Sequence, residues 1–397
     1  MNNKDKVKVL EIGAQSRAKA FGGVESFLFH FYQHMDRKEL ICDFAFCGEN
    51  LMESVMNDPV FENSTFYELK ALKGAHNRVA DYYRLYKCMR DLIKSQKYDV
   101  VHINTNFYPV NVACLLAAKV AKCKVRIAHS HGSKSIATFK IKPRDKVRSL
   151  IQSMLTPIYR YIIRLNATHY FACSTEAGEY LFGKKGLNSP KYKKINNAID
   201  VKRFVYDKTK RDGVRKEHNI QDDEIIIGNI GRLFPFKNQS FLIDVFKIIH
   251  ERNPRSKLWI VGGGYLHDEL ESKIHSLGLS DDAMLLGECS NVPDLMQAMD
   301  LIIFPSPSEG LSIVTIETQA SGLPIYVSDT ISREHKVTDL IEFLPLKEGA
   351  AFWADYIMND FSNKQRRNTF DELRANGYDI SDAASKLEQF YLEASKK

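Results

Sequence analysis

The sequence lacks the features of a membrane-spanning or disulfide-stabilised protein. No stretch approaches the roughly 20 uninterrupted apolar residues that a bilayer-spanning helix needs. The polar N-terminus, Met1 to Lys8, has no apolar core of the kind found in signal peptides. The seven cysteines form no C-x-x-C pair, which predicts reduced, packed thiols rather than disulfides or a zinc site. We therefore expect a cytoplasmic protein.

A large excess of charge is also missing. The formal net charge of +7 over 397 residues is too small for a protein that coats nucleic acid. It suits anionic ligands such as phosphates, or an anionic membrane surface. Hydrophobic residues make up 44% and charged residues 26%, which is a globular composition. At this length the chain should form two domains, each with its own core.

Short apolar runs alternate with amphipathic segments of helical length, and no repeat or low-complexity tract interrupts them. Expected strands are Val7–Gly13, Val100–Asn104, Val125–His129, His169–Cys173, Ile225–Gly231, Leu258–Gly262, Met284–Leu286, Asp300–Pro305 and Pro324–Ser328. Expected helices include Val24–Met35, Asp81–Ser95, Gln239–Glu251, Asn291–Met299, Ser312–Ser321 and Asp382–Ser395. This alternation predicts an α/β protein with parallel sheets that carry helices on both faces.

The expected strands fall into two groups on either side of the Lys-rich segment 184–216, with a boundary near 197–204. We predict an N-terminal domain over residues 1–200 and a second domain over 201–377, with a helix at about 378–397 returning to the first. Each group can form a doubly wound sheet that binds ligands at the carboxyl ends of its strands. Two such domains facing each other would form a deep cleft.

A glycine pair follows the first expected strand, in Phe21-Gly22-Gly23-Val24-Glu25. Glycines let the backbone approach a ligand closely, and the free N–H groups of the next helix would face that ligand. The alternative is an ordinary strand-to-helix turn. The spacing is not G-x-G-x-x-G, so a dinucleotide site is not indicated.

Two further strand ends carry candidate ligand groups. Arg232 and Lys237 follow the expected strand that ends at Gly231, where their cations can clamp a diphosphate and stabilise a nucleoside diphosphate as it leaves. The alternative is two solvated loop cations. Gly263 lies in the turn Val261-Gly262-Gly263-Gly264, which admits a ligand or simply turns the chain tightly.

The strongest signal is a pair of glutamates, Glu309 and Glu317, eight residues apart after an apolar strand. If a helix begins near Leu311 or Ser312, one carboxylate lies in a loop and the other about one and a half turns into the helix. The amides of Gly310, Leu311 and Ser312 would then form an anion-binding helix N-terminus. Ionised carboxylates accept strong hydrogen bonds from sugar hydroxyls.

Two histidines, His129 and His131, alternate at a strand end. Alternation places both side chains on one side of the strand, but no further ligand cluster accompanies them. The sequence also has no convincing Asp-x-Asp after a strand. We therefore predict no metal and no other cofactor.

With these motifs in order, the chain resembles glycosyltransferase family 4, the retaining family of GT-B fold, over almost its whole length. Its closest likeness within the family is to bacterial capsule and exopolysaccharide transferases. The segments that carry the resemblance are the GGVE segment near residue 22, Ala128-His129-Ser130-His131-Gly132, Asn197-Ala198-Ile199-Asp200 to Phe204, Gly231-Arg232 with Lys237, Gly262-Gly263-Gly264, and Glu309 with Glu317. Two positions depart from the pattern: Ala198 replaces the usual hinge glycine, and Ser312 stands where a second glycine is common.

The resemblance implies a role for each residue. Arg232 and Lys237 would bind the donor pyrophosphate, Glu317 the ribose hydroxyls, and Glu309 the donor sugar. Gly22 and Gly23 would close over the phosphates from the first domain, and His131 would lie near the reacting sugar. Uridine is the expected base. No general-base carboxylate stands out in the first domain, which fits same-face attack assisted by the departing phosphate.

The segment 134–164 holds eight Lys or Arg against a single Asp145, and its later half is rich in Leu, Ile, Met and Tyr. A basic surface beside apolar side chains predicts peripheral contact with an anionic membrane at the inner face of the cell membrane. The alternative is an amphipathic helix that covers its own domain.

The sequence, with this resemblance, predicts a retaining transferase that moves a hexose or N-acetylhexosamine from a nucleotide sugar to a glycan or lipid-linked acceptor, and the resemblance implies that the nucleotide is UDP. No nucleic-acid partner is expected. The alternatives are a GT-B nucleotide-sugar epimerase, an inverting transferase, or a non-catalytic glycan- or nucleotide-binding module. Intact Glu309, Glu317, Arg232 and Lys237 argue against the last of these.

Overall fold

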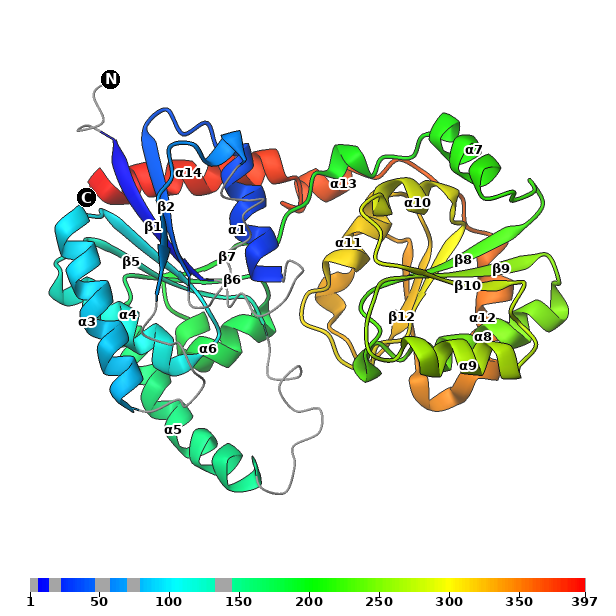
Figure 1. Ribbon diagram of the computed structural model, residues 1–397, viewed down its shortest axis with the longest axis horizontal. Helices are drawn as coiled ribbons and strands as arrows, with labels where there is room; N and C mark the ends of the chain where they lie inside the picture. Colours follow the sequence, from blue (N-terminus) through cyan, green and yellow to red (C-terminus); the bar gives the residue numbers. More distant parts are fainter. Residues whose placement is uncertain (1–5, 14–22, 47–57, 70–78, 133–144, 397) are drawn as a thin grey trace. The chain divides into compact units, whose positions relative to one another are not determined.

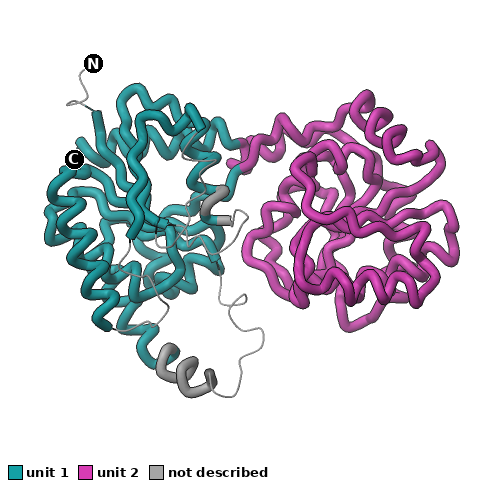
Figure 2. The backbone as a smooth tube through the Cα atoms, viewed as in Figure 1, with its two compact units in different colours: residues 1–198, 380–397 teal, residues 199–379 magenta. Residues whose placement is uncertain are grey.

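The computed structural model describes residues 6–13, 23–46, 58–69, 79–132 and 145–396, and these fall into two compact units (Figure 2). Unit 1 comprises residues 1–198 and 380–397, and unit 2 comprises residues 199–379. Within the described parts of each unit, every strand pairing is parallel, as both expected sheets require. The predicted class, two doubly wound α/β domains, is confirmed.

Unit 1 contains a seven-stranded sheet in the order β3-β2-β1-β4-β5-β6-β7. The strands are β1 (Val7–Gly13), β2 (Leu40–Phe46), β3 (Phe66–Glu68), β4 (Val100–Asn104), β5 (Val125–Ser130), β6 (His169–Ala172) and β7 (Tyr192–Lys194). The helices are α1 (Gly23–His34), α3 (Val79–Gln96), α4 (Tyr108–Val120), α5 (Asp145–Asn166), α6 (Thr175–Leu187) and α14 (Ile380–Lys396). The strand order reverses between β1 and β4.

Alternate residues of β1 supply the two cores of unit 1. Leu10 and Ile12 pack with buried residues of α3 to α6 on one face, while Val9 packs with α1 and α14 on the other. The C-terminal helix α14 lies beside β1 and α1 (Figure 1), with Leu387 and Tyr391 buried in that second core. Burial of one large apolar side chain stabilises the fold by about 1.5–3 kcal/mol. This packing therefore ties the end of the chain to its first strand.

Unit 2 contains a six-stranded sheet in the order β10-β9-β8-β11-β12-β13, which reverses between β8 and β11. The strands are β8 (Ile225–Ile230), β9 (Ser256–Val261), β10 (Ala283–Gly287), β11 (Leu301–Phe304), β12 (Ile325–Ser328) and β13 (Ile341–Leu344). The helices are α7 (Lys208–Glu217), α8 (Gln239–Arg252), α9 (His267–Ser276), α10 (Val292–Ala298), α11 (Ile313–Ala320), α12 (Gly349–Phe361) and α13 (Phe370–Ala375).

All nine strands expected from the sequence are present, with ends that differ by one or two residues. Four strands were not expected: β2, β3, β7 and β13. The last three lie at sheet edges and are three or four residues long, too short for a clear apolar pattern. In β2 the apolar run is interrupted by Asp43, whose carboxylate accepts hydrogen bonds from Tyr98 Oη at 2.5 Å and from the Thr65 amide at 2.7 Å.

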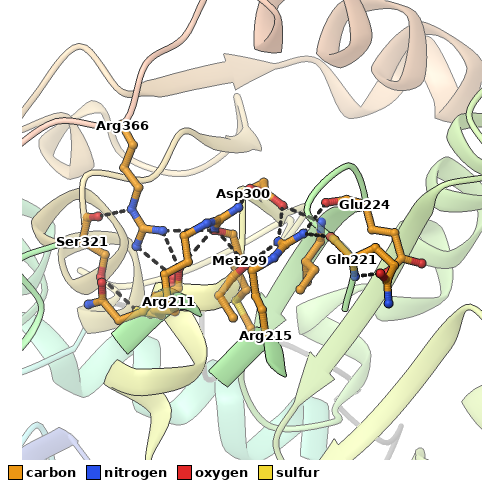
Figure 3. Close-up of polar contacts among 12 residues, drawn as sticks. Arg211, Arg215, Gln221, Glu224, Met299, Asp300, Ser321 and Arg366 are labelled. Carbon is orange, nitrogen blue, oxygen red and sulfur yellow. Dashed lines mark hydrogen bonds and ion pairs between the residues drawn. The ribbon is translucent and has the colours of Figure 1, made fainter. Parts of the chain in front are cut away.

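Three arginines surround the end of α10 and the start of β11 in unit 2 (Figure 3). The Arg366 guanidinium donates to the carbonyls of Ser321, Met296, Gln297 and Met299 at 2.7–3.2 Å. Arg211 and Arg215 contact the same helix end and both bind the Asp300 carboxylate. Burial, and then the positive charge of the nearby Arg211, lower the pKa of Arg366 to about 9. The cluster satisfies carbonyls that a helix C-terminus leaves free.

Replacing Arg366 with Ala should destabilise unit 2, because it removes the donor to the Ser321 and Met296 carbonyls and one of the two arginine donors to the carbonyls of Gln297 and Met299. We expect a loss of about 2–4 kcal/mol in the free energy of unfolding, measured by urea denaturation. Arg367 is the matched control: it forms ion pairs with Asp339 and Glu372 and is more exposed, so Arg367→Ala should cost at most about 1 kcal/mol. Equal losses in the two variants would contradict the capping role.

Candidate active site

The reversal of strand order in unit 2 brings together two loops that carry predicted site residues. The chain leaves β8 toward α8, which packs on one face of the sheet, and leaves β11 toward α11, which packs on the other. Loops that diverge from adjacent parallel strands leave a crevice at their carboxyl ends, where ligands bind in folds of this kind. Arg232 and Lys237 lie in the first loop and Glu309 lies in the second.

Lys237 and Glu309 form an ion pair between these two loops. The Lys237 Nζ atom lies 2.7 Å from Glu309 Oε1, and the side chains are 13% and 9% exposed. The ammonium also lies 4.7 Å from the centre of the Phe304 ring at the end of β11. A buried pair of this kind is strongly coupled, because removing one partner leaves the other charge without compensation. The structure thus joins two predicted residues that are 72 positions apart.

Arg232 lies differently from Lys237, although both follow β8. Its side chain is exposed, and its guanidinium lies 5.1 Å from the centre of the Phe234 ring. Phe234 in turn makes an edge contact with Tyr265, which is 66% exposed. Within the described residues Arg232 therefore remains available to an anion, whereas Lys237 already has a carboxylate as its partner.

The turn after β9 requires glycine at two positions because it packs closely against another loop. Gly262 has a φ of 135°, and a Cβ atom there would lie 2.2 Å from the carbonyl oxygen of Gly231. At Gly264, with a φ of 158°, a Cβ would lie 2.4 Å from the carbonyl oxygen of Leu233. The turn is thus packed against the loop that carries Arg232. At Gly263, the predicted site residue, the near neighbour is instead the side chain of Glu288.

The predicted anion site at the start of α11 needs a correction. Ser312 is the residue before the helix, so the helix begins one residue later than the latest expected start, at Ile313. The Ser312 amide is not free: it donates to His335 Nε2 at 3.0 Å, while His335 Nδ1 donates to the Ser332 carbonyl at 2.8 Å. Burial lowers the pKa of His335, which favours the neutral ring that can accept this bond. No spacing in the sequence pointed to His335.

Glu317 lies on α11 as its fifth residue and is partly buried. Burial raises the pKa of its carboxyl to about 7, and the positive charge of Arg203 only partly opposes the effect. Glu309 and Glu317 therefore occupy different settings: the first is paired with a cation in the loop, and the second lies on the helix, where its carboxyl has no hydrogen bond to the residues that the structure describes. A titrating carboxyl of this kind is typical of functional sites.

In unit 1, His131 follows the end of β5. Its Nε2 atom lies 2.9 Å from Asn104 Oδ1, and its amide donates to Asn106 Oδ1 at 2.9 Å. Burial and then the neighbouring His102 lower the pKa of His131 to about 3, while an interaction with the Asn197 side chain partly offsets them. The ring is therefore neutral. Gly23 begins α1, whereas Gly22 lies outside the described residues.

A buried polar network behind His131 was not predicted. It joins Glu11 of β1, His102 and Asn104 of β4, His129 of β5 and Tyr391 of α14. Each of these residues is at most 6% exposed. The signal in the sequence was a charged or polar residue inside an apolar strand, in VLEIG and VVHIN. Such residues are buried only when they have partners.

Within the part of the chain that the structure describes, one group of side chains has the proximity of metal ligands: His267, Asp268 and Glu271 at the start of α9. His267 is partly exposed, and both carboxylates are exposed. Exposed acidic clusters commonly occur without an ion, and this one contains none of the predicted site residues.

Comparisons with known proteins agree with this geometry. A family model for Glycosyltransferase Family 4 matches residues 21–203, and one for Glycosyl transferases group 1 matches residues 210–371. The chain is 29% identical to EpsF of Bacillus subtilis, a protein named as a glycosyltransferase, over 95% of this chain and 94% of that one. It is 25% identical to the capsular polysaccharide biosynthesis glycosyltransferase CapH of Staphylococcus aureus, over 76% and 79%.

Solved structures share the architecture. HepE from Anabaena, in complex with UDP, matches with a TM-score of 0.68 and 16% identity, over 98% of this chain and 97% of that one. A glycosyltransferase from Rickettsia africae matches with a TM-score of 0.76 and 15% identity, over 99% and 100%. At these identities the likeness establishes the fold, which is GT-B as predicted.

The raised pKa of Glu317 predicts a pH-dependent stability. The folded state holds a proton that the unfolded state releases at the ordinary glutamate pKa, so wild-type stability falls as pH rises from about 4.5 to about 7. Glu317→Gln lacks this proton, so its stability relative to wild type should increase over that window. We expect a change on the order of 1–2 kcal/mol, reduced because the carboxyl is partly solvated. Urea denaturation at pH 5 and pH 8 measures it. A constant difference between the two proteins would contradict the raised pKa.

Proposed function

The chain belongs to the family 4 glycosyltransferases of GT-B fold, and from this we propose that it is a retaining enzyme of cell-surface polysaccharide synthesis. It would move a hexose or N-acetylhexosamine from a UDP-sugar to a glycan or lipid-linked oligosaccharide. The name of an Escherichia coli relative, 26% identical over 60% of this chain, specifies UDP-Gal and a diphosphoundecaprenol acceptor. The observation that carries the proposal is the buried Lys237–Glu309 pair at the strand reversal of unit 2.

The donor would enter this pair by exchange of anions. Lys237 and the exposed Arg232 bind the diphosphate, and the phosphate replaces the carboxylate beside Lys237. Glu309 is then free to accept hydrogen bonds from the sugar hydroxyls, and Glu317 accepts those of the ribose. Gly263 and the segment Gly310–Ser312 belong to the loops that we expect to surround the phosphates. For His131 of unit 1 we retain the role that the family resemblance implies, which is a position near the reacting sugar.

The chemistry follows from these charges. As the bond from the anomeric carbon to the phosphate breaks, negative charge grows on the leaving diphosphate, and the two cations stabilise it more than they stabilise the intact donor. A phosphate oxygen accepts the proton of the attacking acceptor hydroxyl on the same face of the sugar, which gives retention. Because cationic side chains face the leaving group, we propose that the reaction needs no metal ion.

The purified full-length chain should be incubated with labelled UDP-sugars, with and without a lipid-linked glycan acceptor, and with and without EDTA. Acceptor-dependent label transfer, with retained anomeric configuration by NMR and no loss on chelation, is the expected result. A new nucleotide sugar formed without acceptor would indicate an epimerase, and an inverted product an inverting transferase. Donor binding without turnover of any kind would indicate a non-catalytic module. Activity lost on chelation and restored by Mg or Mn would refute the metal-free mechanism.

The two glutamates should have separable effects. Glu317→Ala should weaken UDP and UDP-sugar binding alike, by about 1–3 kcal/mol in calorimetry, because the ribose is present in both ligands. Since ribose hydroxyls bind the ionised carboxyl better, wild-type UDP affinity should also increase as pH rises through about 7. Glu309→Ala should change UDP affinity much less and lower kcat. Equal losses of UDP affinity in two well-folded variants would refute this division.

We also propose that α5 contacts a membrane surface. Met154, Ile158, Tyr161 and Leu165 are each 55–69% exposed, and their spacing of four, three and four residues places them on one helix face.

The prediction of a basic face in this part of the helix is wrong for its two described arginines. Arg160 and Arg164 donate instead to the carbonyls of Tyr180 and Phe182. The remaining basic residues of 134–164 lie outside the described side chains. None of the helices that the structure describes has the length and apolar character needed to cross a bilayer.

Replacing both Ile158 and Tyr161 with Glu should reduce sedimentation with anionic liposomes, because each exposed apolar side chain loses its burial in the interface. We expect a loss of at least about tenfold in partitioning, near 1.5 kcal/mol for the pair. Val120→Glu, at a residue 57% exposed on α4, is the control and should bind as wild type does. If wild-type protein ignores such liposomes at low salt, the membrane proposal fails.

A further inference from the structure

Two chains of hydrogen bonds start at one buried carboxylate, that of Glu11 on β1. We propose that Glu11 is a positioning residue that fixes which ring nitrogens of His102, His129 and His131 carry protons, and so makes the Nδ1 nitrogen of His131 a hydrogen-bond acceptor. One chain runs from Glu11 through Asn104 to His131, and the other runs from Glu11 through His102 to His129.

The first chain determines the proton on His131. Asn104 Nδ2 donates to Glu11 Oε2 at 2.8 Å, so the carbonyl oxygen of the same amide must face the other way. That oxygen lies 2.9 Å from His131 Nε2. An amide oxygen accepts but does not donate, so Nε2 must carry the proton. The ring is neutral because burial, together with His102, lowers the pKa of His131 to about 3. Its Nδ1 atom therefore carries a lone pair and can only accept a hydrogen bond.

The second chain follows the same logic. Tyr391 Oη donates to Glu11 Oε1 at 2.7 Å, and burial, followed by the charge of Glu11, raises the pKa of this phenol, which keeps its proton in place. His102 Nδ1 lies 2.6 Å from Tyr391 Oη and 3.2 Å from Glu11 Oε2, so it donates toward both oxygens. When the His102 ring is neutral, its Nε2 accepts from His129 Nδ1 at 3.0 Å. Burial lowers the pKa of His129 well below its usual value, so that ring is neutral too.

Both chains thus place lone pairs at their ends, on His129 Nε2 and His131 Nδ1. Each of these atoms is buried and has no hydrogen bond of normal geometry to the described residues. The two rings lie together, with centroids 3.9 Å apart, and both contact Phe27. The Asn197 side chain also interacts with His131, and its amide group can donate to the accepting nitrogen. A sugar hydroxyl that reaches His131 would donate a hydrogen bond to Nδ1. This last step rests on the proposed function, whereas the proton positions do not.

The substitution Glu11→Gln tests the proton positions most directly, because it replaces the carboxylate with an amide. This amide has one accepting oxygen and a donating NH₂ group, so it cannot receive both Asn104 Nδ2 and Tyr391 Oη as the carboxylate does. Asn104 is then free to turn and present its NH₂ group to His131, which would accept at Nε2 and carry its proton on Nδ1. Tyr391→Phe is the matched control. It removes one donor from Glu11 but leaves the Glu11–Asn104–His131 chain intact.

Ring-nitrogen NMR of full-length protein labelled with ¹⁵N-histidine reads the tautomers directly, with signals assigned by loss in His131→Gln and His129→Gln. We expect Nε2–H for His131 and Nδ1–H for His129 in wild type, the same His131 signal in Tyr391→Phe, and a shift toward Nδ1–H for His131 in Glu11→Gln. Wild-type His131 protonated at Nδ1 would overturn the proposal, as would an unchanged His131 signal in folded Glu11→Gln. Because this readout needs no substrate, it stands apart from any failure of the transferase assignment.

A kinetic comparison separates positioning from structural damage. In Glu11→Gln, kcat should fall by about two- to tenfold, the worth of one neutral hydrogen bond, while UDP affinity is retained because the groups proposed to bind UDP lie in unit 2. A parallel loss of UDP affinity and thermal stability, without a tautomer change, would show that Glu11 acts only on folding.

Discussion

Parallel strands cannot be joined by tight turns, so each connection must cross a face of its sheet before the next strand begins. This constraint determines most of what the two units have in common. It places helices on both faces, buries the strands on both sides, and gathers all carboxyl ends at one edge of each sheet. Where the strand order reverses, at β1/β4 and β8/β11, the following connections diverge to opposite faces. Polar residues at those two points are brought together by the topology.

The buried carboxylates at the two reversal points have different kinds of partners. In unit 2 a cation and a carboxylate neutralise each other as Lys237 and Glu309, and we propose that the donor diphosphate displaces this carboxylate. In unit 1 the Glu11 carboxylate is satisfied by donors from β4 and α14, which are the Asn104 amide, the His102 ring and the Tyr391 hydroxyl. Carboxylates accept only, so their neighbours are forced into one orientation. The C-terminal helix thus contributes to the strand edge that carries His131.

Much of the fold was predictable because its signals are local. Apolar runs such as Ile225–Gly231 and Leu258–Gly262 are set by burial on both faces of a parallel sheet, and the observed strands differ by only a residue or two at their ends. Edge strands such as β7, with the sequence YKK, are half exposed and carry no such pattern. The expected start of α11 was close to the observed one. The state of the Ser312 amide was not predictable, because its partner His335 lies 23 residues further along the chain.

The sequence by itself determined the fold class, the two-domain division, and the loops on which Arg232, Lys237, Glu309 and Glu317 lie. These follow from periodicity and from residue chemistry, which act over a few neighbouring positions. Only the tertiary structure decided which of those groups are free and which are paired. Lys237 meets Glu309, and Arg160 and Arg164 turn into their own domain. Glu11 meets Tyr391 from 380 residues away. Burial makes a polar side chain take whatever partner the packing brings within reach, and that partner is not encoded in local spacing.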